Sequence, residues 1–125
     1  MRAVWFDKPG PAHEVLQYGE MPDPEPGPGE VRVRIAWSAV NPSDVKRRAG
    51  SSIGPMNFAR VIPNMDGAGS IDRAGPGVDP KRVGERVWLH STQWKRPFGT
   101  GADYAVTPGA RAIALPAAIS FAAGA

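Results

Sequence analysis

The stretch that decides the fold is Val40-Asn41-Pro42-Ser43-Asp44-Val45-Lys46-Arg47-Arg48-Ala49-Gly50, in a chain of 125 residues. Before it, Val31–Val40 alternates apolar residues with polar or small ones, a period of two that predicts a strand with one buried face. Asn41 is a favourable N-cap, and Pro42 suits the first helical position. Gly50 is a natural helix end. We therefore expect a strand that runs directly into a capped single-turn helix.

A second informative stretch is Asp66-Gly67-Ala68-Gly69, which opens a predicted strand over Gly67–Ala74. Glycine within a strand is typical of places where another backbone or a ligand comes close, and we expect mainly the first use here. The separation from Gly50 is too long for one local motif, yet it is short enough for both stretches to line one cleft.

The composition predicts a mainly β chain in a single domain. Fifteen Gly and 14 Pro favour short strands joined by turns, while 42% hydrophobic residues and four Trp supply a core. Trp5, Trp37 and Trp88 lie in strand patterns and are expected in that core. The remaining expected elements are a strand Arg2–Phe6 with its hairpin partner Glu14–Tyr18, strands Glu85–His90, Ala102–Val106 and Ala112–Leu115, loops over 51–63 and Ser91–Gly101, and an unfinished apolar helix over Ala117–Ala125 with nothing to pack against.

Several kinds of site and partner are disfavoured by composition. The chain has no Cys, and its His residues are only His13 and His90, which disfavours disulfides and a metal centre. The net charge of +3 is dispersed except at Lys46–Arg48, so we expect no nucleic-acid partner. The sequence also lacks an apolar run of the roughly 20 residues that span a bilayer. We expect no membrane partner and, by default, a cytoplasmic location.

A nucleotide-binding unit is missing from the sequence, because no Gly-x-Gly-x-x-Gly follows a strand pattern. The chain is therefore expected to be a fragment, or else its partner domain is expected to lie on another polypeptide.

An ordered set of short motifs carries a resemblance to a known family. The motifs are Ala39–Asp44, Arg48–Gly50, Pro63–Gly69, Gly75–Val78, Val83–Val87, Gly101–Val106 and Leu115-Pro116. In this order and spacing the whole chain resembles the N-terminal domain of the medium-chain dehydrogenase/reductase superfamily. The resemblance implies a GroES-like, partly open β-barrel with short helices over residues 1–125. Residues 116–125 would begin the connection to a Rossmann domain that is absent from this chain.

Within that superfamily the chain resembles the zinc-free branch. Zinc-dependent alcohol dehydrogenases place a Cys ligand where Asn41 stands and a His ligand where Met65 stands. The resemblance is greatest to the NADPH:quinone oxidoreductases, which are zeta-crystallin-like. It implies NADPH bound mainly by another domain, no zinc, a quinone or conjugated carbonyl substrate, and a homodimer at full length. The isolated chain is expected to be inactive.

The resemblance also implies candidate site residues. Asn41, Asp44 and Lys46 are the catalytic candidates, and Asn41 with Pro42 would contact the cofactor. An amide at Asn41 can donate to a substrate oxygen or to the nicotinamide ribose, and the helix N-terminus adds a positive end. Quinone reductases commonly carry Tyr at the position of Lys46, which here would supply a cation or simply face water. As alternatives, Asn41 is only an N-cap and Asp44 only a helix-dipole residue.

Trp94 and Phe98 are the candidate substrate-binding residues, because flat apolar walls suit a flat aromatic acceptor. They serve equally well as anchors of their loop. Two other functions remain open for the chain: an enoyl-thioester or alkenal reductase of the same superfamily, and a noncatalytic GroES-like structural or co-chaperonin-type protein.

Overall fold

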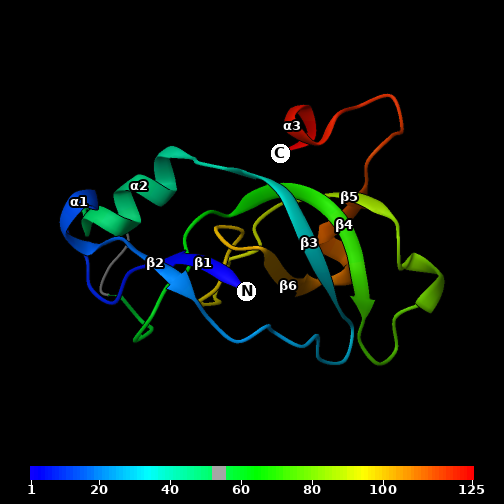
Figure 1. Cartoon of the computed structure of the whole chain (residues 1–125), viewed down its shortest axis with the longest axis horizontal. Helices are drawn as coiled ribbons and strands as arrows, with labels where there is room; N and C mark the ends of the chain where they lie inside the picture. Colours follow the sequence, from blue (N-terminus) through cyan, green and yellow to red (C-terminus); the bar gives the residue numbers. More distant parts are fainter. Residues whose placement is uncertain (52–55) are drawn as a thin grey trace.

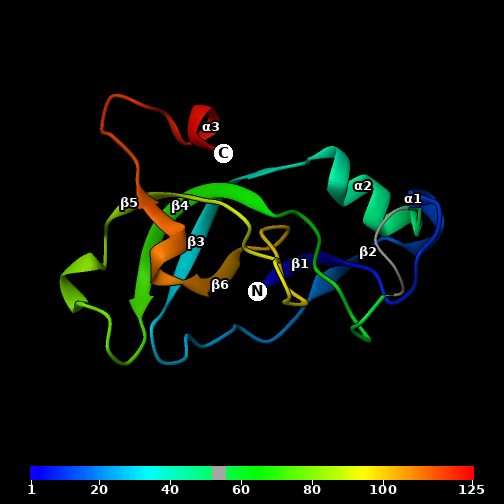
Figure 2. The same cartoon turned by 180° about the vertical axis from the view of Figure 1, so that it is seen from behind.

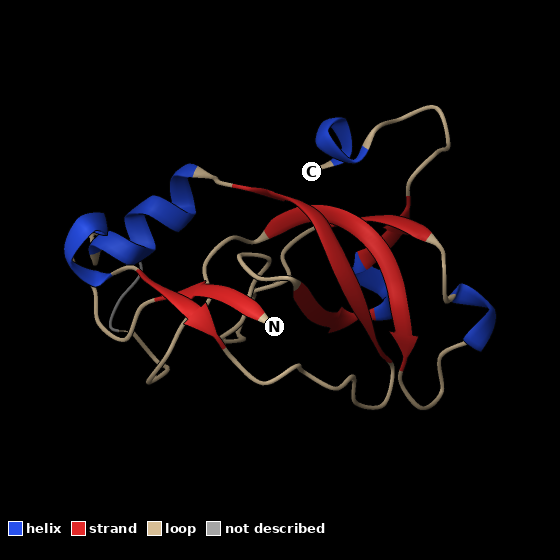
Figure 3. Cartoon of the chain, in the orientation of Figure 1, coloured by secondary structure: helices blue, strands red, loops and turns tan. Residues whose placement is uncertain are grey.

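The computed structural model describes residues 1–51 and 56–125, and it is mainly β with a few short helices (Figures 1 and 3). Four residues of the expected loop 51–63 lie outside the described residues. The strands are β1 (Arg2–Trp5), β2 (Gln17–Glu20), β3 (Glu30–Ala39), β4 (Asp66–Ala74), β5 (Arg86–Leu89), β6 (Tyr104–Pro108) and β7 (Ala112–Ala114). The helices are α1 (Ala12–Val15), α2 (Pro42–Ala49) and α3 (Phe121–Gly124), with short 3₁₀ turns at Pro80–Arg82 and Gly109–Arg111.

Two antiparallel sheets divide the strands. A curled five-stranded sheet has the order β6-β3-β4-β5-β7, and β1 pairs with β2 in a separate hairpin. Both views place the hairpin together with α1 and α2 at one end of the molecule and the large sheet at the other (Figures 1 and 2). This arrangement confirms the predicted GroES-like fold class. No helix within the described ranges is long and apolar enough to cross a membrane.

The β3–β4 pair curls because it contains two register shifts and close-packed glycines. One shift falls between Ile35 and Trp37, where Ala36 has no partner on β4. A Cβ on Gly69 would lie 2.1 Å from the carbonyl oxygen of Arg34, and one on Gly67 would lie 2.8 Å from that of Trp37. The predicted structural use of these glycines, close backbone packing, is therefore confirmed.

The predicted core placement of Trp37 and Trp88 is wrong. The β3 face is buried at Val31 and Val33, but the bulge at Ala36 changes the alternation, and Trp37 is 56% exposed. Trp88 is 37% exposed, because β5 has Val87 and Leu89 as its buried residues. Trp5 is half-buried. The main core is instead Val31, Val33, Ile71, Val87, Leu89, Ala105 and Ala112, and a second cluster joins Phe6, Val15 and Val61.

Helix boundaries also differ from the predictions. The strand expected over Glu14–Tyr18 is wrong at its start, because a helical turn occupies Ala12–Val15 and the strand partner of β1 begins only at Gln17. The single-turn helix after Asn41 is in fact eight residues long. The last helix begins at Phe121 rather than at residue 117, because the Ser120 side chain caps it by accepting from Ala123 N.

The C-terminal segment also has a packing partner, contrary to expectation. Arg86 of β5 donates to the carbonyl of Ile119 at 2.6 Å, and its guanidinium carbon lies 4.5 Å from the centre of the Phe121 ring. These contacts hold the start of α3 against the sheet.

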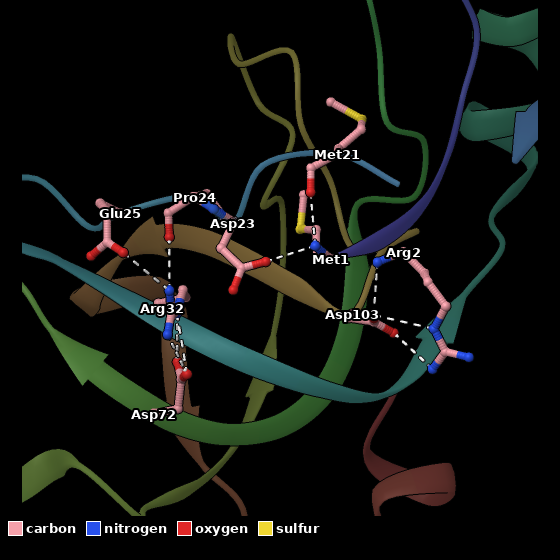
Figure 4. Close-up of polar contacts among 9 residues, drawn as sticks. All are labelled: Met1, Arg2, Met21, Asp23, Pro24, Glu25, Arg32, Asp72 and Asp103. Atoms are coloured by element: carbon pink, nitrogen blue, oxygen red, sulfur yellow. Dashed lines mark hydrogen bonds and ion pairs between the residues drawn. The ribbon is translucent and has the colours of Figure 1, made fainter. Parts of the chain in front are cut away.

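A buried arginine fastens the proline-rich loop to the large sheet (Figure 4). Arg32 is 5% exposed and donates to both carboxylate oxygens of Asp72, from Nε to Oδ1 at 3.0 Å and from Nη2 to Oδ2 at 2.7 Å. The same guanidinium donates to the carbonyl of Pro24 at 3.2 Å and stacks over Tyr104, 4.7 Å from the ring centre. One cation therefore joins β3, β4, β6 and the loop before β3.

The substitution Arg32→Met is expected to destabilise the chain strongly. Methionine keeps apolar contact with Tyr104 but leaves the partly buried Asp72 carboxylate unpaired, a change that costs about 3 kcal/mol. Urea denaturation would measure the loss. In the double variant R32M/D72N the loss should be clearly smaller, because no buried charge remains unpaired. Equal losses in the single and double variants would contradict the ion-pair explanation.

Candidate functional site

The site begins where β3 passes into α2. Asn41 has extended backbone angles, Pro42 occupies the first helical turn, and the backbone N–H of Asn41 donates to Asp44 Oδ2 at 2.8 Å. At the other end Gly50 adopts a φ of +78°, a conformation that favours glycine. The predicted start and end of this helix are therefore confirmed.

The side chain of Asn41 is engaged away from the helix. Asn41 and Asp44 form a capping box, in which the Asn41 side chain faces the N–H of Asp44. That N–H donates to the main-chain carbonyl of Asn41 at 3.0 Å, so the side chain itself makes no cap hydrogen bond. Its Nδ2 donates instead to Asp66 Oδ2 at 2.7 Å, across the 25 residues that separate them in the sequence.

The register of the sheet explains this contact, because Ala39 at the end of β3 pairs with Asp66 at the start of β4. The two stretches singled out in the sequence thus meet at one place. Asp66 itself was missed as a site residue, although it heads the glycine motif.

Asp66 is held on several sides by hydrogen bonds. Its Oδ1 accepts from the backbone N–H of Ser91 at 3.0 Å, and its carbonyl accepts from Thr100 Oγ1 at 2.6 Å. Behind Thr100, Ser38 Oγ lies 2.8 Å from Thr100 Oγ1 and accepts from Asn64 Nδ2 at 2.8 Å. Because Thr100 donates its hydroxyl proton to Asp66, Ser38 must donate to Thr100. The chain of donors therefore runs in one direction, from Asn64 to Asp66.

Asp44 is a buried carboxyl beside this network, with 6% of its surface exposed. Burial raises the pKa of Asp44, and the negative charge of Asp66 raises it further. The backbone N–H of Asn41 and the charge of Arg47 act against that rise. The result is an acid that holds its proton to higher pH than an exposed Asp does.

The other helix candidates lie on different sides of α2. Pro42 and Lys46 are exposed and, being four residues apart, share one helix face. Arg47 donates to Gln93 Oε1 at 2.9 Å, and Arg48 donates to the carbonyl of Gly10. Two members of the basic run therefore tie α2 to neighbouring loops, and Lys46 faces solvent.

Trp94 and Phe98 lie on the irregular loop after β5, as expected for Ser91–Gly101. Trp94 is 53% exposed and Phe98 is 38% exposed. Phe98 borders a small pocket of about 170 Å³ that also contains Glu30 and Arg96. Gln93 anchors the loop, since its Nε2 donates to the carbonyl of Ile62 at 2.8 Å. The structure therefore connects this loop to α2 through Arg47 and Gln93, but it places the two aromatic rings outside the Asn41 network.

A pocket of about 590 Å³ adjoins the same network from the hairpin side. Its walls are mainly apolar, with Leu16, Val40 and Val45 among them, and Asp44 and Asn64 supply polar atoms. Asn41, Lys46, Trp94 and Phe98 do not line it.

Zinc in proteins prefers Cys, His and carboxylate ligands. At the two positions where the resemblance would put the Cys and His ligands, this chain has the amide of Asn41 and the thioether of Met65, and the carboxyls beside Asn41 are those of Asp44 and Asp66. Within residues 1–51 and 56–125, no three His, Cys, Asp or Glu residues come together as a metal-binding group.

Comparison with known proteins agrees with the fold. Residues 27–117 match the family described as "Alcohol dehydrogenase GroES-like domain". The chain is 36% identical to the dehydrogenase orsE of Emericella nidulans, covering 98% of this chain and 35% of that protein. It is 34% identical to the trans-enoyl reductase fsr4 of Gibberella fujikuroi, covering 85% of this chain and 30% of that protein.

A solved structure gives the same result. The quinone oxidoreductase of Pseudomonas syringae pv. Tomato DC3000 superimposes with a TM-score of 0.86 at 28% identity, over 98% of this chain and 36% of that one. The chain thus spans about a third of the length of its relatives. It belongs to the alcohol dehydrogenase GroES-like domain family, within the medium-chain dehydrogenase/reductase superfamily that includes the quinone oxidoreductases.

Proposed function

We propose that this chain supplies the catalytic half of a zinc-independent, NADPH-dependent oxidoreductase that reduces quinones or related conjugated carbonyl compounds. The observation that carries the proposal is the Asn41 amide, held at the start of an eight-residue helix by its 2.7 Å bond to Asp66. A rigid amide beside a helix N-terminus is a fixed polar environment that needs no metal ion. The likeness to a quinone oxidoreductase supports the substrate class.

The proposed division of labour follows from chemistry and position. Two-electron reduction of a quinone needs a hydride and a proton, and the hydride would come from reduced nicotinamide when the cofactor is bound. Asn41 and Pro42 would contact only the nicotinamide end, since this sequence has no pyrophosphate-binding motif. Lys46, exposed one helical turn beyond Pro42, would offer a cation to the developing oxygen charge. Burial raises the pKa of Asp44, which suits a proton donor.

Trp94 and Phe98 remain proposed contacts of the acceptor, reached through the loop that Gln93 and Arg47 tie to α2. A homodimer at full length and a cytoplasmic location remain predictions, as does the lack of nucleic-acid and membrane partners.

Enoyl-thioester reduction is the second candidate, favoured by the likeness to a trans-enoyl reductase and by the apolar 590 Å³ pocket. The two candidates can be distinguished by comparing turnover of 1,4-naphthoquinone with turnover of an enoyl thioester, each measured as the rate of NADPH oxidation. We expect no turnover of either substrate by the 125-residue chain alone. Turnover should appear when the chain is joined to the nucleotide-binding domain of a related quinone oxidoreductase. Activity of the chain alone would contradict the proposed division between two domains.

Asn41→Ala in the joined protein should lower turnover without unfolding the domain. The backbone half of the capping box, from Asn41 N to Asp44 Oδ2, remains in the variant, and the lost side-chain bond to Asp66 costs only about 1 kcal/mol. Steady-state kinetics and thermal unfolding of the same samples would test this. A parallel loss of stability and activity would instead indicate a structural role for Asn41.

Asp44→Asn should change how stability depends on pH. A carboxyl whose pKa is raised in the folded state favours folding at low pH, and this contribution is lost as pH rises through the folded pKa. The variant can still accept the bond from Asn41 N. The unfolding free energy of the wild type minus that of D44N should therefore fall as the pH rises above the ordinary Asp pKa of about 4 and through the raised pKa of the folded state. Groups with lowered pKa values cancel in this difference, and a rise with pH would contradict the burial effect.

A further inference from the structure

We infer that Asp66 is a positioning residue that fixes the polarity of the Asn41 amide, so that Asn41 serves its ligand as a hydrogen-bond acceptor. This inference rests on the proposed function of Asn41. The ligand group that it implies is a hydroxyl, such as one on the ribose of a nicotinamide nucleotide.

Chemistry fixes the orientation of the amide. Only an N–H can face the carboxylate oxygen of Asp66 at 2.7 Å, since the amide oxygen would be repelled. That bond uses one of the two N–H groups of Asn41. Asn41 Oδ1 faces the backbone N–H of Asp44 as half of a capping box, but that N–H donates to the main-chain carbonyl of Asn41 at 3.0 Å. Within the part of the chain that the structure describes, Oδ1 therefore accepts no hydrogen bond of its own. The oxygen, with its two lone pairs, is therefore the larger part of the amide's free bonding capacity.

The carboxylate also strengthens that oxygen as an acceptor. Donation of an N–H to an anion polarises the amide and places more negative charge on its oxygen, while the remaining N–H becomes a poorer donor. Of the two uses expected for Asn41, donation to a substrate oxygen is thus weakened and contact with a hydroxyl is favoured.

Asp66 is well suited to impose this orientation because both of its carboxylate oxygens act as acceptors. Oδ1 accepts from Ser91 N, and Oδ2 accepts from Asn41 Nδ2. The Thr100 hydroxyl fixes the backbone of the same residue at 2.6 Å. Neither side chain can rotate without breaking a bond to a charged group or to the main chain.

Asp66→Asn reverses this arrangement with almost no change in shape. An asparagine here can accept from Ser91 N only by turning its own NH₂ toward Asn41. The Asn41 amide must then rotate to accept that bond, which brings its NH₂ to the free side. The double variant N41D/D66N restores the original polarity, because the amide introduced on β4 donates to the carboxylate introduced before α2. A carboxylate oxygen then again occupies the free side, and the summed charge of the pair is unchanged.

The first test uses the 125-residue chain and does not depend on activity. In ¹H–¹⁵N spectra, the side-chain amide of Asn41 is assigned by its disappearance in Asn41→Asp. One of its two proton resonances should be shifted downfield and protected from exchange in the wild type, and both features should vanish in Asp66→Asn. Asp79→Asn is the matched control, since among the described residues the Asp79 side chain accepts a single bond, from Lys81 N at 2.9 Å. An Asn41 signal that is unchanged by Asp66→Asn would overturn the inference.

The second test measures KM for NADPH in the protein joined to a nucleotide-binding domain. Asp66→Asn should raise KM roughly tenfold, the value of one hydrogen bond near its upper limit, and N41D/D66N should recover most of that loss. A folded double variant that remains as impaired as Asp66→Asn would sink the acceptor assignment. If the wild-type protein shows no turnover, the proposed function fails, and the amide resonances still decide the role of Asp66.

Discussion

The structure depends on the register between β3 and β4. Ala39 pairs with Asp66, so the residue that begins the turn into α2 lies beside the residue that begins β4. Gly67 and Gly69 make that register possible, because a side chain at either position would collide with the backbone of β3. The curl of the sheet and the meeting of Asn41 with Asp66 therefore have the same physical origin.

The sequence contains the local parts of this arrangement but not their connections. Alternation predicted β3, and the capping residues predicted where α2 starts and ends, because both depend on neighbours within one turn or one strand. The bond from Asn41 to Asp66 depends on strand pairing across 25 residues, which no local pattern specifies. The exposure of Trp37 had the same cause, since a bulge opposite Gly69 changes the alternation without a signal in β3 itself.

Interactions of long side chains were equally hard to anticipate. Arg32 occupies a polar position of the strand pattern, which predicts exposure, yet it is buried by Asp72, Tyr104 and the proline-rich loop. The run Lys46–Arg48 looked like one solvated face. In the structure, Arg47 and Arg48 contact two different loops, because successive residues of a helix point in directions about 100° apart.

The candidate site combines features that stabilise it with one that does not. Asp44 closes the first turn of α2, but its burial beside Asp66 disfavours the charged form and costs stability near neutral pH. The opposing contribution comes from the donor chain of Asn64, Ser38 and Thr100, which fixes Asp66 from the side of the apolar pocket.

A domain with no Cys and two separated His residues has few means of holding a reactive polar group in place. Here an amide is oriented by a carboxylate, and the carboxylate is in turn held by backbone and hydroxyl donors. The direction in which Asn41 presents its dipole is thus decided by the sheet rather than by the helix that it begins.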